Sequence, residues 1–244
     1  MTAATTGTAH AHHTADLGSA VWRALGGVQD PELAEPVTDL GFVAHCEVTP
    51  HGEAVVRLRL PTYFCAPNFA FLMVADAYDA AAAVPGVREV TVELLDHFAA
   101  DAINHGVAAR SGFAASFEGE ASGELDELRA DFLRKAVLAG TDRVCRRMVA
   151  DGADAARLTG LTLADAPDGA DTTRLRARRR ELGLPAGDGD PLVIDPATGQ
   201  AVTAGALPRH LHLARTTRVS QDANSGVCRG MLLARYPNGE EATS

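Results

Sequence analysis

Residues 42–60 read FVAHCEVTPHGEAVVRLRL and contain the clearest secondary-structure signal in the chain. Apolar side chains alternate with more polar ones over residues 42–48 and again over 55–60, which is the two-residue period of a half-buried strand. The segment between them, 49–52, is rich in turn-forming residues. The sequence therefore predicts an antiparallel hairpin with one face on the core.

Helical patterns flank this hairpin on both sides. Residues 16–25 begin with a capping aspartate and end at a Gly-Gly pair, while residues 68–84 are apolar and alanine-rich and stop at a Pro-Gly pair. A third strand is expected over residues 88–95. The predicted order is α-β-β-α-β, which is typical of a compact two-layer α+β domain that folds as a unit.

The rest of the chain divides by composition. A disordered tail is expected at 1–15, the α+β domain at 16–107, a long amphipathic helical extension at 108–152 and a partly disordered linker at 153–190. Short strand-like runs favour a small β-rich C-terminal extension at 191–244. The runs that predict it are 192–195, 200–203, 211–219 and 227–235.

Composition and charge exclude several classes of protein. A net charge of −10 opposes general nucleic-acid binding, and no apolar run is long enough to span a membrane. The N-terminal residues lack the basic and apolar regions of a secretory signal, so a soluble, cytoplasmic protein is expected. The four cysteines are far apart without a CxxC pair, so any metal must be held by distant ligands or shared between subunits.

The stretch LPTYFCAPN, residues 60–68, places Cys65 between the end of a strand and the start of a helix. The positive end of the helix dipole would favour the thiolate there, so Cys65 could act as a nucleophile or a metal ligand. The alternative is a small buried core residue, because free cysteines are among the most buried residue types.

Several short motifs occur in a fixed order around this cysteine. They are Asp30-Pro31-Glu32, the stretch VTDLGFV at 37–43, Thr62 with Cys65, and VPGV at 84–87 ahead of VTV at 90–92. Together they resemble the metal–sulfur cluster assembly domain shared by PaaD-like and SufT-like proteins. The resemblance covers about residues 17–97 and implies the same α-β-β-α-β fold.

The resemblance also implies a function. It suggests a factor that matures iron or iron–sulfur centres, with Cys65 as the transient ligand and Asp30, Asp39 and Thr62 as accompanying cofactor-binding positions. The implied partner is a client metalloenzyme such as a multicomponent oxygenase. With a single cysteine in the motif, stable binding is expected to need a second subunit, as in a homodimer, or ligands from the client. An accessory role rather than enzymatic turnover is the leading hypothesis.

Other residue patterns suggest further sites. His97, Asp101 and His105 recur every four residues and would share one helix face, where they could bind a metal or form only a solvated helix end. On the predicted C-terminal strands, His210 and His212 could converge with Cys228, or form an ordinary polar strand face. The assembly-factor hypothesis keeps two alternatives. In one of them Cys65 is an enzymatic nucleophile, and in the other the chain is a client-binding module without a metal.

The remaining candidates have simpler interpretations. In the enzyme hypothesis the base would be His97 or His45. Cys46 and Cys145 lie on apolar faces and are predicted to be core residues. The run at 174–180 contains five arginines, and it is predicted to be a solvated helix face rather than an anion-binding site.

Overall fold

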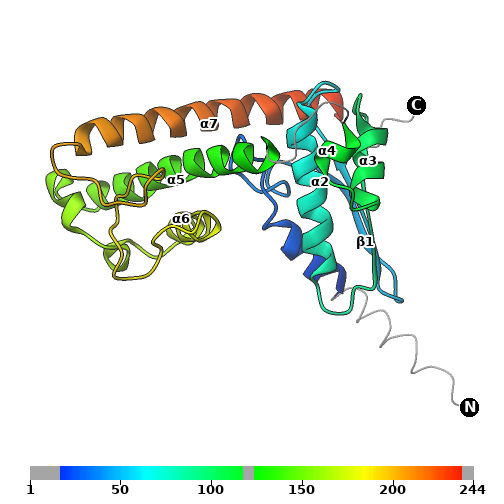
Figure 1. Cartoon of the computed structure of the whole chain (residues 1–244), viewed down its shortest axis with the longest axis horizontal. Coiled ribbons are helices and arrows are strands. Elements are labelled where there is room, and N and C mark those ends of the chain that lie inside the picture. The colour runs from blue at the N-terminus through cyan, green and yellow to red at the C-terminus, as the bar shows by residue number, and fades with distance from the viewer. Residues whose placement is uncertain (1–16, 118–123, 238–244) are drawn as a thin grey trace, which may run out of the picture. The chain divides into compact units, whose positions relative to one another are not determined.

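The computed structural model describes residues 17–117 and 124–237, and Figure 1 labels its helices and strands. The chain forms two compact units. The first contains the described residues up to Leu125 together with those from Ser225 onward, and the second contains Asp126–Asn224. Two long helices, α5 (Glu124–Ala150) and α7 (Leu207–Arg235), contribute to both units. The tail predicted at 1–15 lies outside the described residues.

The first unit contains the predicted hairpin and a third strand. β1 (Val43–Val48) pairs antiparallel with β2 (Glu53–Arg59), and β2 pairs parallel with β3 (Glu89–Leu95), in the order β1-β2-β3. The hairpin turn needs Gly52, whose φ is +85° and where a Cβ atom would lie 2.4 Å from the Gly86 carbonyl oxygen. The alternating pattern of residues 42–60 thus predicted both strands correctly.

Helices cover this sheet and connect its strands. Residues 17–25 are helical, and α2 (Pro67–Ala82) forms the crossover between the parallel strands β2 and β3. Two shorter helices follow, α3 (Ala100–Ala108) and α4 (Phe113–Ser116). The predicted α+β class and the α-β-β-α-β order are therefore confirmed for this part of the chain.

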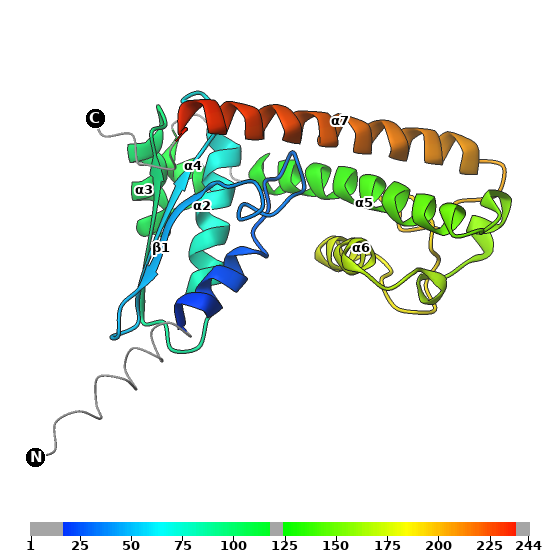
Figure 2. The same cartoon turned by 180° about the vertical axis from the view of Figure 1, so that it is seen from behind.

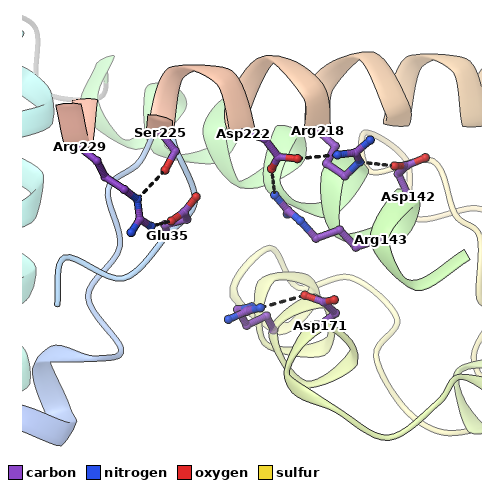
Figure 3. Close-up of polar contacts among 9 residues, drawn as sticks. Glu35, Asp142, Arg143, Asp171, Arg218, Asp222, Ser225 and Arg229 are labelled. Carbon is purple, nitrogen blue, oxygen red and sulfur yellow. Dashed lines mark hydrogen bonds and ion pairs between the residues drawn. The ribbon is translucent and has the colours of Figure 1, made fainter. Parts of the chain in front are cut away.

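The second unit is helical. It contains most of α5, the 3₁₀ turns η1 (Ala155–Gly160) and η2 (Leu163–Asp165), helix α6 (Ala170–Glu181) and the first part of α7. In this unit α5 and α7 lie side by side, as Figures 1 and 2 show. Two ion pairs connect them, drawn in Figure 3: Arg218 with Asp142 at 2.5 Å and Arg143 with Asp222 at 2.7 Å.

The β-rich C-terminal extension predicted for residues 191–244 is wrong. Within the described part, 191–237, strand-like pairing is limited to two isolated bridges, and the runs at 211–219 and 227–235 are parts of α7. The convergence of His210 and His212 with Cys228 across paired strands is lost with it. Among the described residues, neither α7 nor any other helix is long and apolar enough to cross a membrane.

The segment 153–190, predicted as a partly disordered linker, folds around a buried arginine. Arg179 is fully buried, and its guanidinium donates to the carbonyl oxygens of Pro191 at 2.9 Å and Leu192 at 2.5 Å. Burial lowers the pKa of Arg179 to about 10. One member of the arginine run at 174–180 is therefore a core residue, because main-chain acceptors replace the water that it loses.

The first stability prediction concerns Cys145 in the core of the second unit. Its side chain is buried among apolar residues of α5 and its neighbours, and burial raises the pKa of its thiol to about 12. Cys145→Ala should lower the free energy of unfolding by about 1 kcal/mol through lost packing, without changing metal content. Urea unfolding followed by far-UV circular dichroism measures this change. An unchanged midpoint would show that the site repacks without cost.

The second prediction concerns the part of α7 that belongs to the first unit. Leu232 is 6% exposed and packs in the core with the sheet, whereas Leu233 is 68% exposed. Leu232→Ala should lower the stability of the first unit by about 2 kcal/mol or more, and Leu233→Ala by less than about 0.5 kcal/mol. The fluorescence of Trp22, the single tryptophan, reports unfolding of this unit alone. Equal midpoints for the two variants would contradict the assignment.

Candidate functional site

The loop that follows β2 lies at the edge where the two parallel strands end. β2 ends at Arg59 and β3 at Leu95, and these residues are register partners. Because the strands are parallel, the chain leaves both of them at the same edge of the sheet. The loop 60–66 therefore lies beside the segment 96–99.

His97 holds the backbone of this loop at Cys65. Its Nε2 atom lies 2.7 Å from the Cys65 carbonyl oxygen, and the Ala99 amide donates to its Nδ1 atom at 3.2 Å. A carbonyl oxygen only accepts, so Nε2 carries the proton and the ring is neutral; burial also lowers the pKa of His97. Both ring nitrogens thus bind main-chain groups, which makes His97 a positioning residue for the loop.

The thiol of Cys65 is half-buried, with polar and aromatic neighbours. The Thr62 Oγ1 atom lies 3.3 Å from its Sγ atom. Tyr63, Phe64 and Phe98 are exposed around it, and Phe64 has 77% of its surface accessible. The Phe64 ring centroid lies 5.0 Å from that of Tyr63 and 6.0 Å from that of Phe98. An apolar surface therefore adjoins the cysteine.

The two aspartates of the predicted site differ in their surroundings. Asp30 is buried, and the amides of Glu32 and Leu33 donate to its Oδ1 atom at 2.9 and 2.8 Å. Burial raises the pKa of Asp30 to about 6 although these hydrogen bonds favour the carboxylate. Asp39 is exposed, and its carbonyl oxygen accepts a hydrogen bond from Arg229. The Asp30 carboxylate therefore stabilises the turn that follows it, whereas Asp39 contacts α7 through its carbonyl oxygen.

Residues from the end of α7 complete the edge, and sequence reasoning missed them. Arg235 donates to the carbonyl oxygens of Leu60 at 3.1 Å and Asp96 at 2.6 Å, directly after the last paired residues of β2 and β3. The Tyr236 hydroxyl donates to Asp96 Oδ2 at 2.8 Å. These partners are 139 to 175 residues apart in the chain, so no local pattern could have indicated them.

The metal set predicted from four-residue spacing is not brought together. Asp101 and His105 are exposed on α3, whereas His97 precedes that helix and binds the main chain. Across residues 17–117 and 124–237, no group of three or more His, Cys, Asp or Glu side chains could hold a metal ion. A metal site with three or more ligands would thus need at least one ligand from outside the described residues.

The four cysteines are all free thiols. Cys145 is buried in the second unit, as predicted, while Cys46 lies half-buried on β1. Cys228 lies on the part of α7 that packs against the core of the first unit, the same core that Cys65 contacts. His45, the other predicted base, lies on β1 with its Nε2 atom 3.5 Å from Glu47.

A family model supports the resemblance found in the motifs. Residues 19–94 match the family model described as "Iron-sulfur cluster assembly protein". A crystal structure of a domain of unknown function, DUF59, from Bacillus anthracis is 24% identical and covers 35% of this chain and 79% of that chain, with a TM-score of 0.32.

Curated relatives match over the same part of the chain. An iron-sulfur cluster carrier protein of Mycobacterium leprae is 38% identical over 82 residues, which are 34% of this chain and 21% of that protein. The protein of the same name from Mycobacterium tuberculosis (strain H37Rv) is 37% identical over 79 residues, 32% of this chain and 20% of that protein. The chain thus spans about a fifth of the length of these relatives. Residues 19–94 are therefore an iron-sulfur cluster assembly domain, as the sequence motifs predicted.

Proposed function

We propose that this chain is a maturation factor that carries iron or an iron–sulfur cluster to a client metalloenzyme, with Cys65 as the transient ligand. The observation that carries the proposal is the position of Cys65 within the assembly domain. Its thiol lies in the loop at the carboxyl edge of β2 and β3, next to the Thr62 hydroxyl and exposed aromatic rings. Thiolates are the usual protein ligands of iron–sulfur clusters.

Each neighbour of Cys65 has a defined task in this proposal. His97 fixes the main chain of the loop through the Cys65 carbonyl, so the thiol keeps its direction when the cargo leaves. The Thr62 hydroxyl can donate to the sulfur and stabilise negative charge on it. Tyr63 and Phe64 are exposed and suit contact with an acceptor protein, because large aromatic side chains are enriched at interfaces.

In this proposal the cargo is the iron or the iron–sulfur cluster. The chain contributes the Cys65 ligand, in an exposed loop from which the cargo can be released. A client metalloenzyme, such as an oxygenase component, would provide the ligands that receive it. A homodimer could provide a second Cys65 during loading. Little supports the alternative of an enzyme with His97 as the base, because both nitrogens of that ring bind main-chain atoms rather than the thiol.

Cys65→Ser should abolish retention of iron and sulfide after anaerobic reconstitution and should leave the fold intact. The thiol is half-buried in a loop, so its replacement removes little core packing. Absorbance together with iron and sulfide analysis measures retention, and circular dichroism checks the fold. Activation of a client by the same samples provides an independent measurement.

Cys46→Ser is the matched control, because Cys46 is also a half-buried free cysteine of the first unit. It should retain iron and sulfide like the parent. If Cys65→Ser reconstitutes and activates the client as the parent does, Cys65 is not the ligand and the proposed function is wrong.

A further inference from the structure

The second unit contains a groove between α5 and α7 with a volume of about 480 Å³. The two helices lie side by side and run in opposite directions there, as Figure 1 shows. Small-molecule sites in proteins have volumes of about 300–1,000 Å³, so the groove is large enough for such a ligand. Its lining consists of Asp142 and Arg146 from α5 and of Pro208, Leu211, His212 and Arg215 from α7.

A network of ion pairs closes one end of this groove. Arg143 pairs with Asp222, Asp222 pairs with Arg218, and Arg218 pairs with Asp142, as Figure 3 shows. The network contains two carboxylates and two guanidiniums, so its charges balance. Asp142 is buried, and its Oδ2 atom accepts from Arg218 Nε at 2.5 Å. The one carboxylate that lines the groove is therefore already neutralised.

The next turn of each helix breaks this pattern. Arg146 and Arg215 are exposed in the groove, and neither has an ion pair or hydrogen bond among residues 17–117 and 124–237. The arginines on either side of Arg146 in α5 differ, because Arg143 pairs with Asp222 and Arg147 with Asp151. The groove thus presents two positive charges, one from each helix, without a carboxylate to compensate them.

A phosphoryl group fits this pair of charges better than a carboxylate does. It carries about 1.5 to 2 negative charges at neutral pH and has three acceptor oxygens. Each guanidinium can donate two parallel hydrogen bonds to it. The imidazole of His212, which lines the same groove, can add another donor. A carboxylate has a single charge, so it would leave one of the two arginines without compensation.

The rest of the lining is apolar. Leu211 is half-buried and packs against the core of the second unit, and Pro208 lies three residues before it on the same helix face. Free phosphate would leave these side chains in water. An organic group attached to the phosphate would cover them, and burial of apolar surface favours binding. The lining therefore suits a phosphate with an organic substituent.

We propose that this groove binds a small phosphate monoester, with Arg146 and Arg215 at the phosphoryl group and with Pro208 and Leu211 against the organic part. The site belongs to the second unit and lies outside residues 19–94, which match the assembly family. The inference is therefore independent of the role proposed for Cys65, and its test needs neither iron nor a client.

Isothermal titration calorimetry of the full chain with phenyl phosphate tests the site, in a buffer free of phosphate and sulfate. The parent should bind one equivalent. Arg146→Ala and Arg215→Ala should each weaken binding at least about tenfold, because each removes charge-assisted hydrogen bonds. Both side chains are exposed, so the variants should keep the fold, which far-UV circular dichroism checks.

Arg209→Ala is the matched control. Arg209 is also exposed on α7 and has no ion pair or hydrogen bond within the described parts of the chain, but it does not line the groove. Its replacement should change the affinity less than about twofold, since exposed charges outside a site contribute little. If the parent shows no saturable binding, or if all three arginine variants weaken it equally, the inference is wrong.

Two further titrations of the parent test the class of ligand. Inorganic phosphate should bind several-fold more weakly than phenyl phosphate, because it leaves the apolar side chains uncovered. Benzoate keeps the ring but has one charge, and it should bind at least about tenfold more weakly. Equal affinities for phenyl phosphate and benzoate would contradict recognition of a phosphoryl group. Equal affinities for phenyl phosphate and inorganic phosphate would show that the organic part makes no contact, which would overturn the assignment of a monoester.

Discussion

The parallel pairing of β2 with β3 is the constraint on which the candidate site depends. Parallel strands require a crossover, which α2 provides, and they bring the segments after both strands to one edge. His97 can therefore reach the Cys65 carbonyl from 32 residues away in the chain. An antiparallel β3 would place His97 at the opposite edge. Strand direction, more than the identity of any loop residue, thus decides which groups surround the thiol.

Much of this domain could be predicted from local patterns. The alternation over 42–60 and the Pro-Gly stop after residue 84 act within a few residues, and both strands and α2 follow them closely. Cys65 could be identified as the candidate ligand from its place between β2 and α2. The role of His97 could not, because four-residue spacing suggested a helical metal set with Asp101, whereas its ring serves the main chain. The crossover rule for parallel strands was the signal that would have placed it correctly.

The C-terminal helix shows why the rest could not be predicted. Buried positions on α7 recur at seven-residue intervals, as at Leu207, Ala214 and Gln221, but several are small or polar. The sequence therefore lacks a clear apolar helical stripe, and the β-branched residues near 216–219 are typical of a strand. The burial of Arg179 could not be predicted for a similar reason. The sequence alone does not distinguish a buried arginine from a solvated one, because its carbonyl partners are distant in the chain. The strands predicted within α7 and the solvated position predicted for Arg179 are thus wrong for related reasons. In α7 polar or small residues occupy buried positions, and the partners of Arg179 are far away in the sequence.

The first unit is discontinuous in sequence, which affects the order of events during synthesis. Its final segment, from Ser225, emerges from the ribosome only after the whole second unit, Asp126–Asn224, has been made. At ordinary elongation rates this delay is on the order of ten seconds. During that interval the nascent chain has Cys65 but lacks Arg235, which donates to the carbonyl oxygens of Leu60 and Asp96 in the complete first unit. The hydrogen bonds from Arg235 to the residues that follow β2 and β3 therefore form only after the second unit has been synthesised.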